Sequence, residues 1–501
     1  MDVDVIVVGA GPTGLLLATE LGLAGASATV LELLPTPSMQ SKGGGIQPRT
    51  AEVFELRGLM APLLERALPH GAVAGHFAGL PVELDCGPFG TRYPHPVSVP
   101  QAAVEAVLAE AAARRGVPIR RGHQVTDLHV EPDSVRVTVC AGGAEYRACA
   151  GHLVACDGGH STVRRLLGVP FPGEAGARTS TVADVRLAAA SASVPQHGGR
   201  MADLVHSGGG YWTMLSPSGD GRHRLVFGTL DPSAGPTRAD PITRDEVDAV
   251  LRAVHGRPTR LGELLEGSRF TDGTRQLERY RYDRVLFAGD AAHVHPPLGG
   301  QGLNLGIQDA MNLGWKLAAT VLGRAPAGLL DTYHEERHQV AAAVLRHTKA
   351  QRVLAERRPT PDVAALRDIV TELIRLPDAN RYLAGLMSGL GLRYPMPHQP
   401  DDPLVGGRMP DLELTVDGRP GRVSELLHDG RGVLLSLAER PDLDAVRLPD
   451  GVARYSAKTA EQFPANAVLI RPDGHIGWAS RRGELGTDGL RAALRRWFTP
   501  S

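Results

Sequence analysis

The sequence of 501 residues predicts an α/β protein with a parallel sheet, an antiparallel sheet inserted into it, and a separate C-terminal unit. The chain opens on a strand, a glycine turn, a helix and a second strand. Short alternating runs occupy its middle, from about residue 176 to 272, and a proline-rich connector precedes its last hundred residues. A chain of this length exceeds one ordinary core. We therefore expect units over residues 1–175, 176–275, 276–395 and 396–501, the first and third forming one framework.

The N-terminal unit is a strand-helix-strand motif. Residues 5–8 are a β-branched run, as expected of a buried parallel strand, residues 13–23 have apolar side chains at helical spacing, and residues 28–31 give the next strand. A further helix is expected over 102–115.

A glycine motif joins this first strand to its helix. Gly9, Gly11 and Gly14 have GxGxxG spacing. The first allows a tight turn, the second lets backbone approach a pyrophosphate, and the third lets helix pack on strand. Free amides at the helix N-terminus favour phosphates, and Glu32, at the end of the second strand, can accept hydrogen bonds from an adenosine ribose. Glycines kept for packing alone are the alternative.

The middle and the end of the chain have sequence patterns typical of β-strands. "YWTMLS" and "HRLVFGTL", in the unit 176–275, predict antiparallel strands. Helices are expected over 308–322 and 330–348. Near the end, "RGVLLSLAE" and "NAVLIRPDGHIGWAS" predict strands, the second a hairpin turned at Pro472-Asp473-Gly474.

The stretch "RVLFAGDAAHVHPPLGGQGLNLG" begins with another strand of the parallel sheet. Its residues favour FAD over NAD as the bound dinucleotide. Its buried strand places Asp290 at a carboxyl end, where ligands bind in open α/β sheets. An aspartate there can hold a polyol hydroxyl, which the ribityl chain of FAD has and NAD lacks. Pro296 and Pro297 stiffen the chain, and the glycines at 299, 300 and 302 leave room for a flat ring. The helix dipole that follows would stabilise the negative charge of a reduced flavin.

Two histidines in this stretch also suggest other chemistry. His293 and His295 are compatible with acid–base catalysis or with a metal site. No carboxylate or cysteine cluster completes such a site, so we expect no metal. We expect His293 to be a hydrogen-bonded structural residue.

Composition narrows the class of protein. The net charge is -1, which gives no indication of a nucleic-acid or membrane partner, and no uninterrupted apolar run is long enough to span a bilayer. The four cysteines, without CxxC spacing, indicate free thiols, and the acidic N-terminus does not resemble a signal peptide. We expect a cytoplasmic protein, a monomer or a homodimer.

Taken in order, three motifs resemble one family. The GxGxxG, the Asp157-Gly158 pair in "ACDGGHSTVRRLLG" and the "GDAAH" segment at 289–293 resemble the FAD-dependent aromatic hydroxylases of the para-hydroxybenzoate hydroxylase type. "HFAGLPVEL", "TRQLERYRYDRVLFAGDAAH" and "PPLGGQGLNLGIQDAMNLGWKLA" are most similar to aromatic polyketide hydroxylases of angucycline and anthracycline pathways and to rifampicin monooxygenases. The resemblance implies a Rossmann-like FAD-binding domain, an inserted sheet that binds substrate, and a thioredoxin-like C-terminal domain. That domain has no cysteine, so a redox role for it is excluded.

The resemblance also implies roles for particular residues. Glu32 would bind the adenosine ribose, Gln101 the flavin chain near the pyrophosphate, and Asp290 the ribityl hydroxyls. Asp157 would bind FAD or pyridine nucleotide, or else cap the turn that follows it. Gly302, Leu303 and Asn304 would present backbone to the pyrimidine edge of the flavin, and Pro297, which stiffens this loop, completes the expected cofactor-binding set.

One segment departs from the family pattern. Where many relatives have Arg-x-Arg, this chain has "SKGGGIQPRT", so that Lys42 fits the first position and Gly44 replaces the second. Lysine lacks the bidentate fork of arginine, so we expect the phosphate contact here either to be weaker or to be supplied by another residue. Arg49 fits an arginine close to flavin and substrate and is the candidate catalytic side chain, with a salt-bridging role as the alternative.

The implied activity is hydroxylation. NADPH (or NADH) would reduce the FAD, O2 would add at the flavin C4a carbon, and the hydroperoxide would pass one oxygen atom to an electron-rich ring of a polycyclic polyketide. The protein would orient the substrate and exclude water. Inactivation of an antibiotic, Baeyer–Villiger insertion, a flavin oxidase or dehydrogenase, and a flavoprotein that only binds ligand are the alternatives.

Overall fold

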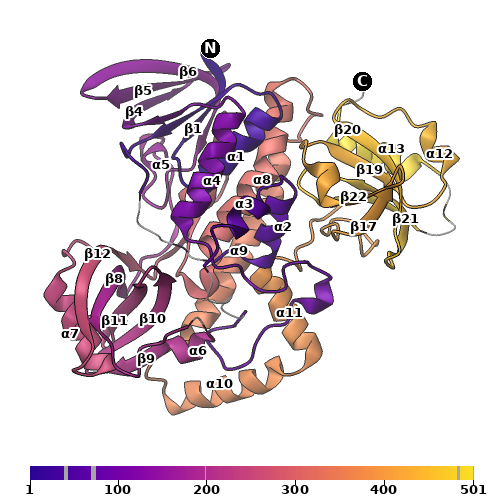
Figure 1. Ribbon diagram of the computed structural model, residues 1–501. Helices are drawn as coiled ribbons and strands as arrows, with labels where there is room; N and C mark the ends of the chain where they lie inside the picture. The colour runs from indigo at the N-terminus through magenta and orange to yellow at the C-terminus, as the bar shows by residue number, and fades with distance from the viewer. Residues whose placement is uncertain are drawn as a thin grey trace.

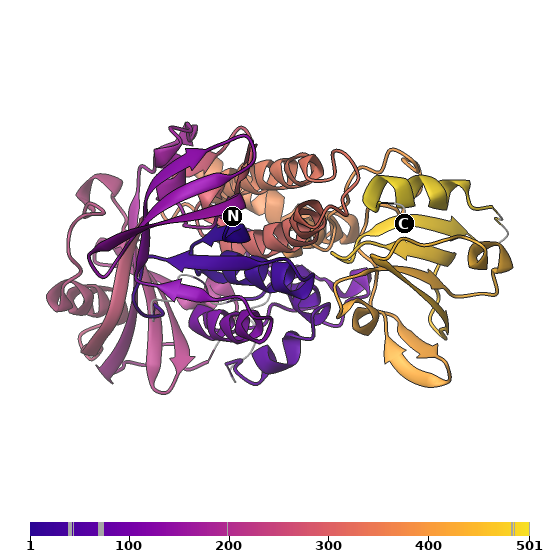
Figure 2. The same cartoon turned by 90° about the horizontal axis from the view of Figure 1, so that it is seen from above.

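The computed structural model describes residues 1–38, 43, 45–68, 75–197, 199–481, 484 and 486–499. Figure 1 shows three parts: a sheet with long helices at the centre, a second sheet at the lower left, and a C-terminal lobe at the right. Seen from above, the central part lies between the other two (Figure 2). None of the described helices combines the length and the apolar character needed to cross a bilayer.

The central part is the predicted α/β framework. Its eight-stranded sheet has the order β14-β15-β6-β1-β2-β3, and β5 joins β4 to β6. The pairs β1–β2, β1–β6, β2–β3 and β6–β15 are parallel. The strands are β1 (Val3–Val8), β2 (Ala28–Glu32), β3 (Ile119–Arg121), β4 (His123–Val130), β5 (Val135–Ala141), β6 (Ala144–Ala155), β14 (Arg281–Tyr282) and β15 (Val285–Phe287).

Helices from both halves of the chain complete the central part. They are α1 (Pro12–Leu23), α2 (Pro48–Glu55), α3 (Met60–Leu64), α4 (Gln101–Arg114), α5 (Thr162–Leu166), α8 (Gln301–Val321), α9 (Asp331–Leu354), α10 (Pro361–Ile374) and α11 (Pro377–Ser388). Glycines bring α1 and α8 close together: a Cβ on Gly306 would lie 2.3 Å from Thr13 Oγ1, and one on Gly314 would lie 2.4 Å from Glu20 Cβ. The N-terminal half is thereby joined to the later half.

Two helices differ from the prediction. Helix α8 begins at Gln301, seven residues before the expected 308, because Gly299 (φ 74°) and Gly300 (φ 64°) turn the chain directly into it. Polar and glycine residues in its first two turns obscured the apolar periodicity. Helix α9 continues to Leu354, beyond the expected 348. The helices α2, α3, α5, α10 and α11 had no prediction.

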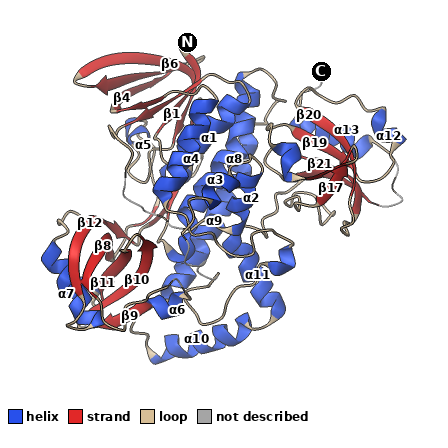
Figure 3. Cartoon of the chain, viewed as in Figure 1, coloured by secondary structure: helices blue, strands red, loops and turns tan. Residues whose placement is uncertain are grey.

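The inserted unit is an antiparallel sheet of order β12-β8-β11-β10-β9. Its strands are β8 (Thr179–Ala189), β9 (Val205–Gly208), β10 (Tyr211–Gly219), β11 (Arg222–Thr229) and β12 (Arg260–Thr271), with α6 (Met201–Leu204) and α7 (Arg244–His255). Helix α7 covers one face, where Val185, Leu215 and Leu225 pack against its Val250 and Leu251. In Figure 3, α7 lies on the outer side of this sheet, and the opposite face is turned toward the helices of the central part. A small sheet of β7 (Gly173–Glu174), β13 (Thr274–Gln276) and β16 (His293–Val294) lies where the insertion leaves and rejoins the framework.

The C-terminal lobe is a mixed sheet of order β18-β17-β20-β19-β21-β22. Its elements are β17 (Glu413–Val416), β18 (Arg419–Arg422), β19 (Gly432–Ser436), α12 (Pro441–Asp444), β20 (Val452–Lys458), β21 (Ala465–Ile470), β22 (Ile476–Arg481) and α13 (Asp488–Trp497). The parallel pair β19–β20 with antiparallel β21 and β22 forms the thioredoxin-like core, to which the β17–β18 hairpin is added. The predicted turn at 472–474 is confirmed, with Gly474 at φ 77°.

The turn of this β21–β22 hairpin is buried in the central part of the molecule. Arg471 is fully buried; its Nη1 and Nη2 lie 2.6 and 2.9 Å from the carboxylate of Glu336 on α9, and it also pairs with Asp473. Lys316 of α8 donates to the same Glu336 over 2.7 Å. Burial lowers the pKa of Lys316 to about 8, whereas Arg471 and Lys316 outweigh burial at Glu336 and lower its pKa to about 2. The carboxylates are thus charged near neutral pH, and the lobe is attached by buried ion pairs.

Candidate functional site

The three motif glycines differ in what surrounds them. Gly9 has φ 105°, and a Cβ there would lie 2.4 Å from the Cys156 carbonyl oxygen; a Cβ on Gly14 would lie 2.1 Å from the Gly9 oxygen. Both positions therefore require glycine for the fold. A Cβ on Gly11, in contrast, would meet nothing within 4 Å. Gly11 precedes α1, whose N-terminus has no side-chain cap, so that open space faces free backbone amides.

Glu32 stands beside this glycine turn. Its Oε2 accepts a hydrogen bond of 2.7 Å from the Ala10 amide, and its Oε1 accepts one of 2.9 Å from the Leu34 amide. The half-buried carboxylate is thus held in one orientation at the end of β2. Each carboxylate oxygen has further acceptor capacity, so both remain available to hydroxyl donors.

The segment 289–304 has the features expected of a flavin shelf. Buried β15 leads to Asp290, which is exposed and for which no side-chain hydrogen bond is found among the described residues. A Cβ on Gly302, in the first turn of α8, would lie 3.8 Å from Asp290 Oδ1, and one on Gly300 would meet nothing within 4 Å. Pro297 is also exposed. A carboxylate, a proline and open backbone therefore border the same space.

Helix α8 points its N-terminus at this space. The helix is 21 residues long, and its N-cap residue, Gly300, provides no side-chain cap. The amides of its first turn are therefore available, and the helix dipole places partial positive charge there. An electron-rich group bound at the shelf would be stabilised.

A pair of amide side chains connects the shelf to a second segment. Asn304 Oδ1 accepts from the Gln47 amide over 2.8 Å, and Asn304 Nδ2 donates to the carbonyls of Gly45 and Gly300. Gln47 Nε2 donates to the Gly299 carbonyl over 3.0 Å. Asn304 was expected here for its backbone, and Gln47 was not expected, because only the tertiary structure brings residues 45–47 to α8.

Gln101 lies at this same junction. A Cβ on Gly43 would lie 3.5 Å from Gln101 Oε1 and 3.6 Å from Leu303 Cδ1, so these predicted residues come together. Gln101 Nε2 also donates to Glu105 over 2.8 Å. Lys42 and Gly44, on which the predicted departure from the family pattern rests, are outside the described residues.

His293 has the structural role expected of it. The side chain is fully buried, and its Nε2 lies 2.7 Å from Asp309 Oδ2. Asp309 also accepts from the Gly289 amide over 3.1 Å and from Arg337 Nε over 2.7 Å. Burial raises the pKa of Asp309, but Arg337 and His293 outweigh it and hold the pKa below its usual value. This buried cluster fixes the shelf from beneath. Asp309 and Arg337 were not predicted. The only sign of them in the sequence is that each is a charged residue within the apolar pattern of a helix.

His295 is bonded within its own loop. Its Nδ1 lies 2.8 Å from the Pro296 carbonyl, which can only accept, so Nδ1 carries the proton. Burial lowers the pKa of His295 and favours the neutral ring. Among the residues with described positions, no three histidine, cysteine, aspartate or glutamate side chains are grouped to hold a metal ion.

Asp157 caps a helix. Its Oδ2 accepts from the amides of Thr162 (2.7 Å) and Val163 (3.1 Å), at the start of α5. Burial raises the pKa of Asp157. This is the more modest of its two predicted roles. Its Oδ1 is buried and has no hydrogen-bond partner within the described part of the chain, which keeps a ligand contact open as a proposal.

Arg49 has the ion-pairing role that the sequence analysis left as the alternative. The side chain is 3% exposed; its Nη1 lies 3.1 Å from Glu52, and its Nη2 donates to the Asp473 carbonyl over 2.9 Å. The guanidinium therefore points to the buried hairpin turn of the C-terminal lobe. Its direction does not support the catalytic role for which the residue was named.

The inner face of the inserted sheet offers a surface for a flat ligand. Trp212, Met214, Val182 and Val226 alternate with the residues that pack on α7, so they belong to the opposite face. A Cβ on Gly228 would lie 2.8 Å from Trp212 Nε1, which shows that the indole lies over this glycine. This part of the face carries apolar and aromatic side chains, and the Arg357 guanidinium lies over the Trp212 ring, 5.1 Å from its centre.

A charged pair borders this apolar surface. Arg224 Nη2 lies 3.1 Å from Asp184, and Arg224 Nη1 donates to the Gly43 carbonyl over 3.4 Å. The sheet thus reaches the segment beside Gln101 and Leu303. A ligand on its inner face would lie next to the shelf.

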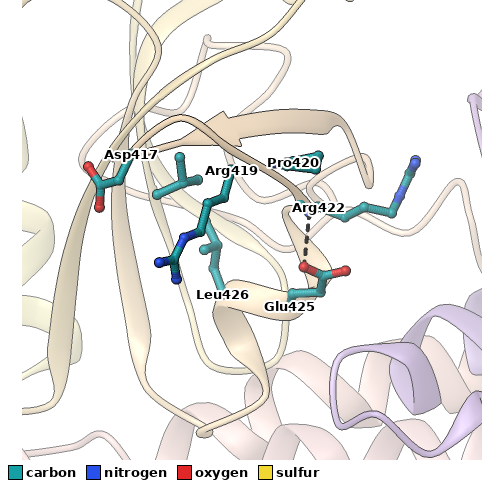
Figure 4. A pocket seen from close by; sticks show the side chains of 8 residues that line it. Asp417, Arg419, Pro420, Arg422, Glu425 and Leu426 are labelled. Carbon is teal, nitrogen blue, oxygen red and sulfur yellow. Dashed lines mark hydrogen bonds between the residues drawn. The ribbon is translucent and has the colours of Figure 1, made fainter.

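A separate surface pocket lies in the C-terminal lobe. Its volume is about 470 Å³, and Figure 4 shows Asp417, Arg419, Arg422 and Glu425 around it. Arg422 is already paired with Asp411 and Glu413, at 2.9 Å each, and its amide donates to Glu425. The pocket shares no residue with the shelf and is not part of the candidate site.

Comparisons with known proteins agree with this geometry. Residues 2–348 match the family described as FAD binding domain, and residues 402–501 match the family described as aromatic-ring hydroxylase, C-terminal. The chain is 43% identical to 12-dehydrotetracycline 5-monooxygenase/anhydrotetracycline 6-monooxygenase of Streptomyces rimosus, over 100% of this chain and 99% of that protein. It is also 43% identical to a rifampicin monooxygenase of Streptomyces venezuelae, over 99% and 98% of the two chains. The solved structure of the anhydrotetracycline hydroxylase OxyS from Streptomyces rimosus superposes with a TM-score of 0.90, at 43% identity and 100% coverage of both chains.

Proposed function

The chain belongs to the FAD-binding-domain family and is a flavin-dependent monooxygenase of the aromatic hydroxylase type. We propose that it hydroxylates a polycyclic aromatic polyketide with NADPH (or NADH) and O2. The observation that carries the proposal is the shelf: exposed Asp290 beside Gly302, with open space at Gly300 and Gly11 before two uncapped helix N-termini. These groups suit a ligand with phosphates, a polyol and an electron-rich ring, which FAD combines. When bound, FAD supplies the redox chemistry that activates O2.

We assign the cofactor contacts as follows. The amides after Gly11 hold the pyrophosphate, Glu32 the adenosine ribose, and Asp290 the ribityl hydroxyls. Backbone of the first turn of α8 meets the flavin ring. The complete proposed set is Gly9, Gly11, Gly14, Glu32, Lys42, Gln101, Asp157, Asp290, Pro297, Gly302, Leu303 and Asn304, of which Lys42 lies outside the described residues.

The substrate would lie between the shelf and the inserted sheet. There, Trp212, Met214 and Val226 offer an apolar platform, and Arg224 borders it with a charged group held by Asp184. Such a platform binds a fused-ring system and excludes water from the reacting face. A phenolic polyketide is activated by its own hydroxyl, so the chain needs no acid–base pair to make the ring electron-rich. The units 1–175, 176–275, 276–395 and 396–501 are the proposed domain boundaries.

The test is substrate-stimulated NADPH oxidation by the FAD-loaded enzyme. Anhydrotetracycline and rifampicin, the compounds in the names of the two relatives, are the first probes, each with ¹⁸O2 and mass spectrometry of the product. Stimulated oxidation with one labelled oxygen atom in the ring system of anhydrotetracycline supports the proposal. Peroxide release without an oxygenated product would contradict it and indicate an oxidase, and failure to reduce bound FAD would indicate a ligand-binding flavoprotein.

Antibiotic inactivation is the second candidate, because the rifampicin monooxygenase matches with the same identity and nearly the same coverage. It predicts labelled product from rifampicin and loss of its antibacterial activity. The same incubation therefore separates the two candidates. Light scattering after size-exclusion chromatography decides between the monomer and the homodimer.

A further inference from the structure

We propose that the C-terminal domain is a positioning element of the flavin site, acting through α2. This proposal rests on the proposed FAD site, since α2 would transmit the position of the lobe to the shelf. Its basis is a continuous series of buried contacts from the β21–β22 turn, through α2, to residues 45–47 and α8. In this proposal the residues that attach α2 to the lobe act as positioning residues.

The N-terminal end of α2 is attached to the shelf. Gln47, directly before the helix, donates its amide to Asn304 Oδ1 over 2.8 Å and its side-chain amide to the Gly299 carbonyl over 3.0 Å. Ile46 pairs with Val97 in an isolated β-bridge, which further restrains residues 45–47. Any shift of α2 along its axis would therefore be felt at Gly299 and Asn304.

The rest of α2 is attached to the C-terminal lobe. Arg49 Nη2 donates to the Asp473 carbonyl over 2.9 Å. Glu52 lies 2.9 Å from Arg408, a residue of the lobe, which also donates to the Phe89 carbonyl. The Glu55 carbonyl lies 3.1 Å from His428 Nε2, which must be the donor there. The lobe thus contacts α2 at residues 49, 52 and 55, which are spaced about one helical turn apart.

The residue just beyond α2 adds a fourth attachment. Arg57 donates to the carbonyls of Leu427 and Pro472, each over 2.9 Å, while its Nε and Nη2 bind Glu20 of α1 at 2.7 and 2.8 Å. Arg57 is 8% exposed. It therefore joins α1, which follows the Gly11 turn, to the lobe as well.

These contacts make α2 and the lobe move as one body. The lobe offers backbone carbonyls to Arg49 and Arg57, and both guanidiniums are buried. Separating the lobe from α2 would take one carbonyl acceptor from Arg49 and two from Arg57, and these buried N–H groups cost more to leave unpaired than a small coupled displacement does. The hairpin turn is in turn fixed by Arg471 and Glu336. The lobe therefore sets where residues 45–47 meet α8.

The experiment compares two variants of the full-length protein that remove buried groups of the lobe. Arg408→Gln removes the ion pair to Glu52, whereas Leu490→Ala truncates a fully buried side chain of α13, the helix that packs on β22. Thermal unfolding of the apoproteins measures the loss of stability of each. Flavin fluorescence gives the dissociation constant of FAD, and the fluorescence anisotropy of bound FAD shows how firmly the flavin is held. Both values change if the shelf is displaced.

We expect Arg408→Gln to weaken FAD binding by roughly 10-fold and to lower the anisotropy of bound flavin. Leu490→Ala, at a similar loss of thermal stability, keeps both values within about two-fold of the wild type. Equal weakening in both variants, or none in either, would overturn the proposal, because the lobe would then be a cap only. If Arg408→Gln does not fold, His428→Phe, which has no donor for the Glu55 carbonyl, takes its place, with an expected weakening of about three-fold. FAD binding needs neither NADPH nor polyketide, so an inactive hydroxylase leaves this result intact, and a wild type without FAD affinity refutes the proposed function instead.

Discussion

Replacing Gly11 by alanine separates the effect of this residue on the stability of the fold from its effect on FAD binding. The backbone at Gly11 (φ -77°, ψ 178°) suits any residue, and the added Cβ would meet no atom within 4 Å. Alanine at an N-cap costs up to about 1 kcal/mol relative to better caps, and the loss of glycine entropy in the unfolded chain offsets about 0.4–1 kcal/mol of that. The apoprotein should therefore keep its Tm. The new methyl group, however, occupies the space where a pyrophosphate would approach the amides.

The loss in FAD binding follows from those amides. Moving a phosphate away from one amide removes a charge-assisted hydrogen bond, worth about 1.5–3 kcal/mol, which is roughly 10- to 150-fold in Kd. Differential scanning fluorimetry of the apoprotein and fluorescence titration with FAD measure the two effects. Gly14→Ala is the matched comparison: its Cβ would lie 2.1 Å from the Gly9 oxygen, so it should lower the apoprotein Tm itself by about 5 °C or more. Unchanged FAD affinity in Gly11→Ala would refute the placement of the pyrophosphate.

Three further outcomes are expected. Asp290→Ala, at an exposed residue, should change the stability of the apoprotein by less than about 0.5 kcal/mol yet weaken FAD binding roughly 10-fold; equal affinity would contradict the ribityl assignment. Glu336, whose pKa is lowered from 4.5 to about 2 despite its burial, stabilises the fold fully above pH 4.5, and this stabilisation is lost as the pH falls from 4.5 toward 2. The Tm of Glu336→Gln should therefore be lower than that of the wild type at neutral pH and depend less on pH in that window, and parallel profiles would count against the ion pairs with Arg471 and Lys316. Gly228→Ala, which places a Cβ 2.8 Å from Trp212 Nε1, should raise the KM for an accepted polyketide several-fold without changing the Kd of FAD, and a change in FAD binding alone would argue against a substrate platform there.

The framework of the fold was predictable because its signals are local. The β-branched run before Gly9, the apolar spacing of α1 and the Pro472-Asp473-Gly474 turn each depend on neighbours within a few residues, and the structure confirms all three. The start of α8 was wrong by seven residues, since the first helical turns contain glycine and polar residues rather than an apolar stripe. Their side chains serve the shelf and its contacts, which a periodicity search does not detect.

The partners of the site residues were not predictable from the sequence. Gln47 meets Asn304 across 257 positions of the chain, and Arg49 meets the Asp473 carbonyl across 424. No pattern in the sequence relates residues so far apart. For the same reason the sequence suggested that Arg49 faces the flavin, whereas the C-terminal lobe supplies the acceptor that directs the guanidinium away.

The sequence by itself determined the class of cofactor. A glycine turn before a helix, an acid after the second strand and an aspartate at the end of a buried strand each place a defined group at a defined end of the sheet, because strand and helix geometry are local. Only the tertiary structure decided how these groups are held: the buried Asp309 and Arg337 beneath the shelf, and the hairpin turn of the C-terminal domain against α2. Buried charges need partners, and which partners they find depends on packing between elements that the sequence lists far apart.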